Sequence, residues 1–238
     1  MQFKEAMAAL EKAGTAQNRK IYPRHGIGGQ MFGVSYSTLG ALAKSIGRDH
    51  ALARELFASG NHDARALAMK IADPAQATVR ELEAWAKDLD NYVITDAFSG
   101  YAAKTSFARV LAPKWIAAKS EWVGRAGWQL YAHFAMDEEP TPDAEFEALL
   151  ATIVRDIHGS KNRVRDAMNM TMIAIGGRNP SLTAKALAAA KQIGVVEVDH
   201  GETGCKTPDA AGYIARMLAH KKTVAARKAA KTTPKKKG

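Results

Sequence analysis

The 238-residue sequence predicts an all-α protein. Most of its segments place apolar residues three and four positions apart, as Leu39, Leu42 and Ile46 do, which is the spacing of an amphipathic helix. Only residues 195–198, VVEV, have the composition of a strand, and no second strand is available to pair with them. Because similar helices also recur along the chain, we expect them to form a repetitive array.

Capping residues predict where these helices begin and end. Ser, Thr and Asp side chains accept hydrogen bonds from the free N–H groups at a helix start, whereas Gly or Pro ends a helix. Starts are expected at Ser35 or Ser37 and at Asp49, ends at Gly47 and Gly60, and a break at Asp73-Pro74. In chain order, helices are expected over residues 2–13, 35–46, 49–59, 62–72 and 78–89, from Tyr92 onward, and over 106–111, 114–119, 121–136, 142–157, 162–175, 181–193 and 209–220.

Three of the expected helices resemble one another: HDARALAMKIAD, EWVGRAGWQLYAHF and NRVRDAMNMTMIAIG. Each carries an arginine just inside its start, namely Arg65, Arg125 and Arg165. Arg125 and Arg165 lie 40 positions apart, which fits the period of HEAT or armadillo helical pairs. The step of 60 positions from Arg65 to Arg125 does not fit one unit and indicates an irregular repeat around Asp96. The predicted fold is a HEAT/armadillo-like α-α superhelix of paired antiparallel helices, whose curvature would present a concave face.

The charge of the chain is concentrated at its C-terminal end. The net charge is +10, and eight basic residues with no acid follow from Lys221 onward. No large apolar residue follows Val224, so we expect a single helical domain over residues 1–220 and a disordered polybasic tail over residues 221–238. Such a tail favours a polyanion such as nucleic acid. A purely solubilising role explains the same composition.

Two stretches of the body are basic as well. Residues 101–125 contain one acid and residues 161–178 contain one, Glu121 and Asp166. On a concave face their cations would form a basic groove for a long polyanion, although ordinary solvated helix surfaces have the same composition. The cations are Lys104, Arg109, Lys114, Lys119 and Arg125 in the first stretch, and Lys161, Arg163, Arg165 and Arg178 in the second.

Several classes of protein are disfavoured by what the sequence lacks. A single cysteine, Cys205, excludes an internal disulfide and fits a reducing compartment. No apolar run is long enough for a transmembrane helix, so no membrane association is expected. The sequence has no phosphate-binding loop, dinucleotide motif, HExxH motif or serine-nucleophile elbow, and we expect neither a cofactor nor a metal.

The stretch WAKDLDNYVITD, residues 85–96, contains the most informative polar residue. Tyr92 and Asp96 are four positions apart and share one helical face, among apolar neighbours such as Val93 and Ile94. A carboxylate on such a face is costly to bury without a partner. Asp96 therefore faces a groove or meets a cation, unless it is an ordinary exposed residue.

These segments, taken in order, resemble the bacterial DNA alkylation repair family, the HEAT-like-repeat alkylpurine DNA glycosylases of the AlkD type. The likeness covers residues 21–193 and is strongest in FGVSYSTLGALAKSIGRDH, WAKDLDNYVITD, WVGRAG and NRVRDAMNMTMIAIGGRNP. It implies a superhelix that wraps DNA and an active centre of one Asp, one Arg and two Trp. The Asp resembles Asp96 and the Arg resembles Arg125, while Tyr92 and Met170 stand at the two Trp positions. Further contacts to DNA are expected from Arg163, Arg165 and Lys104.

The chemistry of such a centre can be argued from charge. An N3- or N7-alkylated purine is cationic, and cleavage of its glycosidic bond develops positive charge on the deoxyribose. A carboxylate such as Asp96 would stabilise that charge and position a water molecule. Arg125 would contact backbone phosphates, and aromatic faces would attract the cationic base.

We therefore expect a DNA-repair protein, a hydrolase that excises N3- or N7-alkylated purines from duplex DNA. The resemblance further implies a monomer in the bacterial cytoplasm, associated with the nucleoid. Two alternatives remain open: a non-catalytic HEAT-like module that binds DNA or another nucleic acid, and a protein-interaction scaffold.

Other residues have separate predictions. Trp115, Trp122 and Trp128 are expected mainly in the core rather than on DNA. His25 could contact phosphate or order its loop. Residues 196–210, VEVDHGETGCKTPDA, contain potential metal ligands but no zinc spacing, and an ordered loop is the preferred interpretation.

Overall fold

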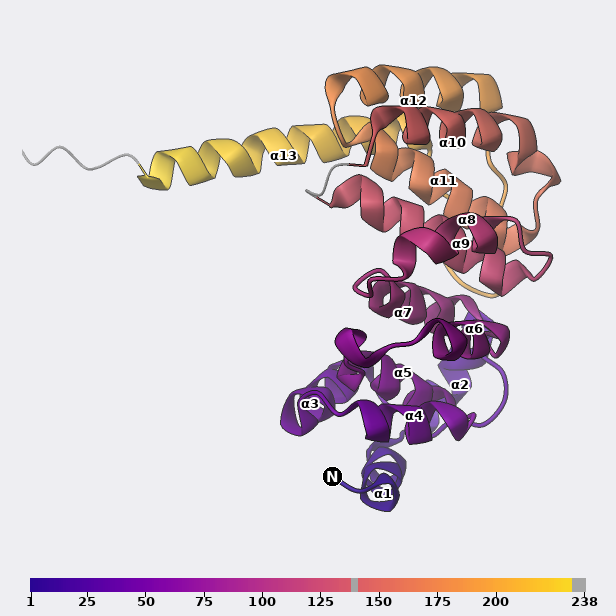
Figure 1. Cartoon of the computed structure of the whole chain (residues 1–238), viewed down its shortest axis with the longest axis vertical. Coiled ribbons are helices and arrows are strands. Elements are labelled where there is room, and N and C mark those ends of the chain that lie inside the picture. The colour runs from indigo at the N-terminus through magenta and orange to yellow at the C-terminus, as the bar shows by residue number, and fades with distance from the viewer. Residues whose placement is uncertain (138–140, 233–238) are drawn as a thin grey trace, which may run out of the picture.

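The computed structural model describes residues 1–137 and 141–232 and shows helices throughout, with no strand in these ranges (Figure 1). The α-helices are α1 (Phe3–Ala13), α2 (Ala16–Ile21), α3 (Tyr36–Ile46), α4 (His50–Ala58), α5 (His62–Ile71), α6 (Val79–Lys87), α7 (Tyr92–Ala102), α8 (Ala108–Ile116), α9 (Glu121–Met136), α10 (Asp143–Asp156), α11 (Asn162–Gly176), α12 (Pro180–Ile193) and α13 (Ala210–Thr232). Short 3₁₀ helices cover η1 (Tyr22–His25), η2 (Pro74–Gln76) and η3 (Ile157–Gly159).

The helices stack in the repetitive way that the sequence predicts. α5, α7, α9 and α11 pack one against the next and form what we call the inner layer. α4 and α8 pack on α5 and α9, and α10 and α12 pack on each other and on α11. The expected all-α, HEAT-like array is confirmed (Figure 1).

The inner layer is buried on several sides because each of its helices has neighbours before and after it in the stack. α9 and α11 are buried along most of their length, and Phe98 of α7 is fully buried. A side chain of this size stabilises the fold by about 1.5–3 kcal/mol when fully buried. Gly127 permits the close approach of α9 to α8, because a Cβ atom there would lie 2.5 Å from the backbone nitrogen of Ile116.

Most predicted helix boundaries are confirmed. Ser35, Asp49 and Thr78 accept hydrogen bonds from backbone N–H groups at the starts of α3, α4 and α6. Gly47 ends α3 with a positive φ of 75°. The capping chemistry of single residues therefore sets where these three helices begin.

Two local predictions are wrong. Pro113 does not separate two helices but lies inside α8. Leu111, Ala112 and Trp115 of the same helix are buried, and their burial outweighs the cost of an interior proline, which is about 3 kcal/mol. Residues 195–198 are not a strand but part of an irregular connection between α12 and α13.

The expected disordered tail also needs correction. Residues 221–232 continue α13 without interruption, so the predicted domain boundary at residue 220 falls inside a helix. Ala, Lys and Arg are strong helix formers, and no Gly or Pro interrupts this stretch. The remaining tail residues, 233–238, lie outside the described residues. Within the described part, no helix combines the length and apolarity needed to cross a membrane.

Candidate functional site

Three inner helices, α7, α9 and α11, bring the predicted site residues to one place. Asn91 starts α7 by accepting a hydrogen bond from the backbone N–H of Ile94 at 3.0 Å. Tyr92 and Asp96 therefore lie one turn apart on α7. Arg125 lies in the first part of α9, the next inner helix, and Met170 lies on α11 beyond it.

Asp96 and Arg125 form a bidentate ion pair. Nε of Arg125 donates to Oδ1 of Asp96 at 2.7 Å, and one terminal nitrogen donates to Oδ2 at 2.9 Å. The other terminal nitrogen donates to Asp166 of α11 at 2.7 Å and to the carbonyl oxygen of Arg163 at 3.0 Å. One guanidinium thus joins carboxylates from the inner helices on either side of it.

This arrangement changes the expected role of Arg125. Its side chain is only 4% exposed, and four of its five N–H groups donate within the chain. Burial alone would lower the pKa of Arg125, but Asp96 and Asp166 outweigh burial and raise it. The guanidinium is therefore largely occupied inside the protein, and the expected contact between Arg125 and a DNA phosphate stays a prediction. Arg125 holds the carboxylate of Asp96, whose side chain is 40% exposed, toward a pocket.

Tyr92 also has partners of its own. Its hydroxyl is 3.0 Å from Nδ1 of His25, so His25 links η1 to α7. The guanidinium of Arg163 lies over the Tyr92 ring at 4.6 Å, and that of Arg125 lies 5.7 Å from the ring centroid. The aromatic face that was expected to stack on a cationic base already faces a cation of the chain.

The pocket next to Asp96 has a volume of about 260 Å³. Its helical wall includes Gln129 and Asp166, which sequence reasoning did not select. Both lie one helical turn from a selected residue, Gln129 after Arg125 and Asp166 before Met170, so helical spacing could have identified them. The other wall belongs to the connection between α12 and α13, through His200, Thr203, Cys205, Lys206 and Pro208.

This connection, residues 194–209, crosses the inner layer in a defined path and lines one side of the pocket. The Asn162 side chain exchanges two hydrogen bonds of 2.8 Å with the backbone of Asp199. Asn169 donates to the carbonyl oxygen of Pro208 at 3.0 Å. Gly201 lies against the carbonyl oxygen of Arg24, which a Cβ atom would approach to 2.9 Å. The preferred interpretation of an ordered loop is confirmed, and within the described residues no group of three His, Cys, Asp or Glu could hold a metal.

The three predicted DNA contacts are in different surroundings. Arg163 lines the Asp96 pocket. Arg165 donates to the carbonyl oxygens of Glu197, at 2.8 Å, and Ser160, at 3.0 Å, so it holds the connection in place and lies outside the pocket lining. Lys104 lines a separate cavity of about 460 Å³ near Arg109 and is not brought to Asp96.

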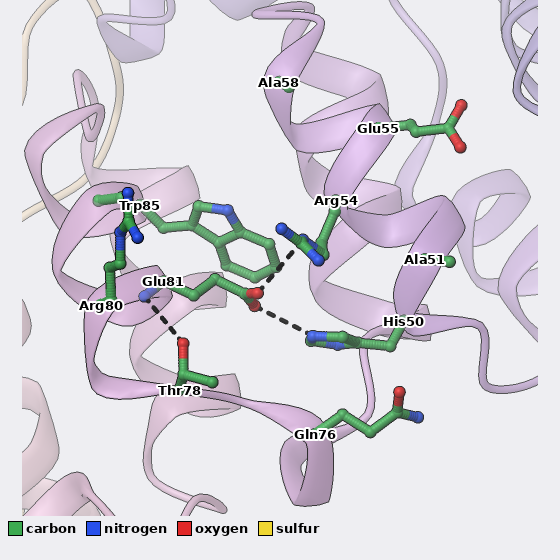
Figure 2. Close-up of a pocket in the computed structure, with 11 residues that line it drawn as sticks. His50, Ala51, Arg54, Glu55, Ala58, Gln76, Thr78, Arg80, Glu81 and Trp85 are labelled. Atoms are coloured by element: carbon green, nitrogen blue, oxygen red, sulfur yellow. Dashed lines mark hydrogen bonds and ion pairs between the residues drawn. The ribbon is translucent and has the colours of Figure 1, made fainter.

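A larger recess, about 960 Å³ in volume, lies between α4 and α6 and shares no residue with the Asp96 pocket. Figure 2 shows the Glu81 carboxylate between His50 and Arg54, with the Trp85 indole beside them. Nitrogen–oxygen distances of 3.2 Å and 3.4 Å join Glu81 to these two side chains. The Glu81 carboxylate is therefore paired with the Arg54 guanidinium across two helices.

The predicted core position of the tryptophans is confirmed for two of them. Trp115 is 2% exposed and Trp128 is 3% exposed. Trp122 is partly buried against the same core. The aromatic surface needed to stack on DNA bases is therefore not supplied by Trp115 or Trp128.

Proteins similar to this chain are known both by sequence and by structure. A solved structure from "a new family of proteins related to the HEAT-like repeat DNA glycosylases with affinity for branched DNA structures" is 29% identical with a TM-score of 0.85, covering 93% of this chain and 95% of that one. The uncharacterized proteins Lin0241 of Listeria innocua serovar 6a and Lmo0209 of Listeria monocytogenes serovar 1/2a are 30% and 29% identical over 90% of this chain and 94% of their own length. The family model described as "DNA alkylation repair enzyme" matches residues 6–229. The chain therefore belongs to the DNA alkylation repair enzyme family.

Proposed function

We propose that this protein binds DNA along its inner layer, at the Asp96 pocket, and prefers branched DNA to a continuous duplex. The observation that carries this proposal is the wall that residues 200–208 form along one side of the pocket. We infer that a straight duplex following the inner layer would meet this wall on its way to Asp96. The arms of a branched molecule diverge at the junction and can pass on either side of it.

Two further considerations support this preference. The similar solved structure belongs to a family with affinity for branched DNA. Bending a continuous duplex of 20–30 base pairs by 40–90° costs of order 1–6 kcal/mol, whereas a junction is already bent. Arg163 and Lys206, which line the pocket from opposite sides, supply positive charge for the phosphates nearest the junction.

A second candidate function is the excision of N3- or N7-alkylated purines by hydrolysis of the glycosidic bond. The observation that favours it is the Asp96 carboxylate, which is held by Arg125 and partly exposed in the pocket. Such a carboxylate would stabilise positive charge that develops on a deoxyribose. Against it, Arg163 covers the Tyr92 ring with a like charge, and Met170 offers no aromatic face to a cationic base.

Both functions can be tested with the same purified protein. Affinity is measured for a three-way junction and for a linear duplex of equal base-pair number and composition, at fixed salt. The proposal expects the junction to bind at least about tenfold more tightly, a difference of about 1.4 kcal/mol. Equal affinity for both would overturn the branched-DNA preference, and no affinity for either would favour a protein-interaction scaffold instead.

Excision is measured as the release of 7-methylguanine or 3-methyladenine from methylated duplex DNA. Excision is supported if the parent protein releases the base faster than the spontaneous rate. The Asp96→Asn variant should then release it more slowly than the parent while still binding the junction. Release at the spontaneous rate by the parent protein would overturn excision and leave the DNA-binding proposal standing. Asp166→Asn serves as the matched control, because it neutralises the other carboxylate of Arg125 on the pocket wall.

A further inference from the structure

The second half of α13 leaves the helical array. Figure 1 shows α13 beginning beside α11 and α12 and then projecting beyond them. Ile214 is fully buried, Met217 lies against Gly177, and Nζ of Lys221 donates to the carbonyl oxygen of Gly177 at 2.8 Å. Beyond this last attachment, residues 222–224 and Arg227 are exposed. We call residues 222–232 the basic arm.

The basic arm carries only positive charge. Its four cations are Lys222, Arg227, Lys228 and Lys231, and no Asp or Glu occurs from residue 210 to the end of the chain. With a rise of 1.5 Å per residue, the 11 residues of the arm span about 16 Å. That length matches roughly half a turn of B-form DNA, which is about 34 Å per turn.

The same composition excludes other classes of partner for this helix. A helix that lies in a membrane surface needs large apolar residues on one face, and a helix that docks in a protein groove needs apolar anchors at helical spacing. After Val224 the arm contains only Ala, Arg, Lys and Thr. Attraction to a dense row of negative charges needs no apolar face, and the DNA backbone supplies such a row.

We propose that the basic arm contacts the phosphate backbone of a second duplex arm when the inner layer holds the first arm of a branched DNA. This proposal rests on the proposed function and adds a second element that strengthens junction binding relative to duplex binding. The arm starts at the last helical pair and points away from the array, so it places positive charge beyond the stacked helices. Two contacts joined in one molecule act at a high effective concentration, so modest contacts of the arm increase affinity for junctions selectively.

The test uses the full chain and a variant that keeps the helix but removes the charge of the arm. This arm variant carries Lys222→Gln, Arg227→Gln, Lys228→Gln and Lys231→Gln, since Gln retains helix propensity. The control variant removes the same net charge at four exposed lysines of the N-terminal helices: Lys4, Lys12, Lys44 and Lys70, each changed to Gln. Circular dichroism and the urea midpoint establish that both variants fold like the parent.

Affinity is then measured for the three-way junction and the linear duplex across a series of salt concentrations. The arm variant is expected to bind the junction about tenfold more weakly and the duplex less than about threefold more weakly. Its salt slope on the junction should fall by about 0.9 for each DNA phosphate that the arm no longer neutralises. The control variant is expected to keep the junction-to-duplex ratio of the parent.

Each other result has a distinct meaning. If the parent prefers the junction and the arm variant prefers it equally, the arm proposal is overturned while the proposed function stands. Equal weakening on junction and duplex, or equal weakening in the arm and control variants, overturns the arm proposal as well, because it shows general electrostatics. A parent without any preference for junctions overturns the proposed function and the arm proposal together.

Discussion

Arg65 and Arg125 occupy matching places in two inner helices, and both are almost completely buried, with 4% and 3% of their surface exposed. Arg65 of α5 donates to Asp90 at 2.9 Å and to the carbonyl oxygen of Asp88, in the turn before α7. Arg125 of α9 donates instead to Asp96 of α7 and Asp166 of α11. The first arginine joins a helix to a turn, and the second joins three helices.

The difference shows how a repeated stacking contact becomes a site. The partner of Arg65, Asp90, has a side chain that is 57% exposed on the surface. The carboxylate of Asp96 faces a pocket instead, and with Asp166 it gives the cluster one formal positive and two formal negative charges. A buried arginine at this place is therefore part of the stacking of the array, and the nature of its carboxylate partners decides whether it also shapes a pocket.

The largest expected effect is on stability and separates the two arginines. Arg125→Met leaves two carboxylates without their partner, and breaking a buried pair costs about 3–5 kcal/mol. Arg65→Met leaves one mainly exposed carboxylate and one carbonyl, so its cost should be about 1.5–3 kcal/mol. Urea denaturation of both variants gives the free energies of unfolding. The comparison fails if the destabilisation by Arg65→Met equals or exceeds that by Arg125→Met.

Substitutions of the carboxylate partners should destabilise the protein in the same order, Asp166 more than Asp90, but by less than the substitutions of the arginines. Asp166 is 13% exposed at its side chain, so Asp166→Asn weakens a buried charged hydrogen bond and should cost about 1–3 kcal/mol. Asp90→Asn affects a solvent-exposed pair and should cost less than about 1 kcal/mol. If urea denaturation gives equal destabilisation for the two variants, the Asp166 pair is not more strongly buried than the Asp90 pair, and the comparison is wrong.

Two tyrosines whose hydroxyl groups contact histidines give a finer comparison. Tyr92→Phe removes the 3.0 Å contact to His25 and keeps the ring beneath Arg163, with an expected destabilisation of about 0.5–1.5 kcal/mol. Tyr36→Phe removes a longer contact, 3.3 Å, to His62 and should cost less. Thermal unfolding of the two variants side by side measures the difference, and a larger destabilisation by Tyr36→Phe would contradict the order.

The smallest expected effect is a pH dependence of the free energy of unfolding, and it comes from His62, which lies near Arg65. Burial lowers the pKa of His62, and Arg65 adds to this effect while Asp63 and Asp90 oppose it. Between the lowered folded pKa and the unfolded value near 6.5, the unfolded state binds more protons, so the free energy of unfolding falls as the pH falls. The slope cannot exceed about 1.4 kcal/mol per pH unit for one proton.

A His62→Gln variant provides the control for this pH dependence. Its free energy of unfolding should vary less steeply than that of the parent as the pH falls through the unfolded pKa of histidine, near 6.5, in urea titrations at each pH. Identical slopes in the parent and the variant would show that His62 does not contribute to the acid sensitivity of this region.

Local chemistry made most of the fold predictable. Ser35, Asp49 and Thr78 cap helices because their side-chain oxygens accept hydrogen bonds within the next turn, which is a property of a few consecutive residues. The meeting of Asp96 and Arg125 followed from matching positions in a resembling family. Helical spacing alone could not have shown it, because the two residues lie on different helices.

The remaining features depend on contacts between distant parts of the chain. Residues 194–209 form one wall of the pocket because Gly201 reaches Arg24 and Asn162 holds Asp199, and no local pattern records either contact. Likewise, the placement of Arg163 over Tyr92 depends on how α11 stacks next to α9 and α7. The helical extension of α13 differs from the expected disorder because the helix propensity of Ala, Lys and Arg outweighs the repulsion among their like charges.

The central claim is that DNA contacts the inner layer at the Asp96 pocket. The most direct measurement is the junction affinity of an Arg163→Glu variant against that of Arg80→Glu, an equal charge reversal at the exposed rim of the recess between α4 and α6. We predict that Arg163→Glu weakens junction binding by at least about tenfold, or 1.4 kcal/mol, and that Arg80→Glu changes it by less than about threefold. Equal weakening in the two variants, or a greater effect of Arg80→Glu, would contradict the claim.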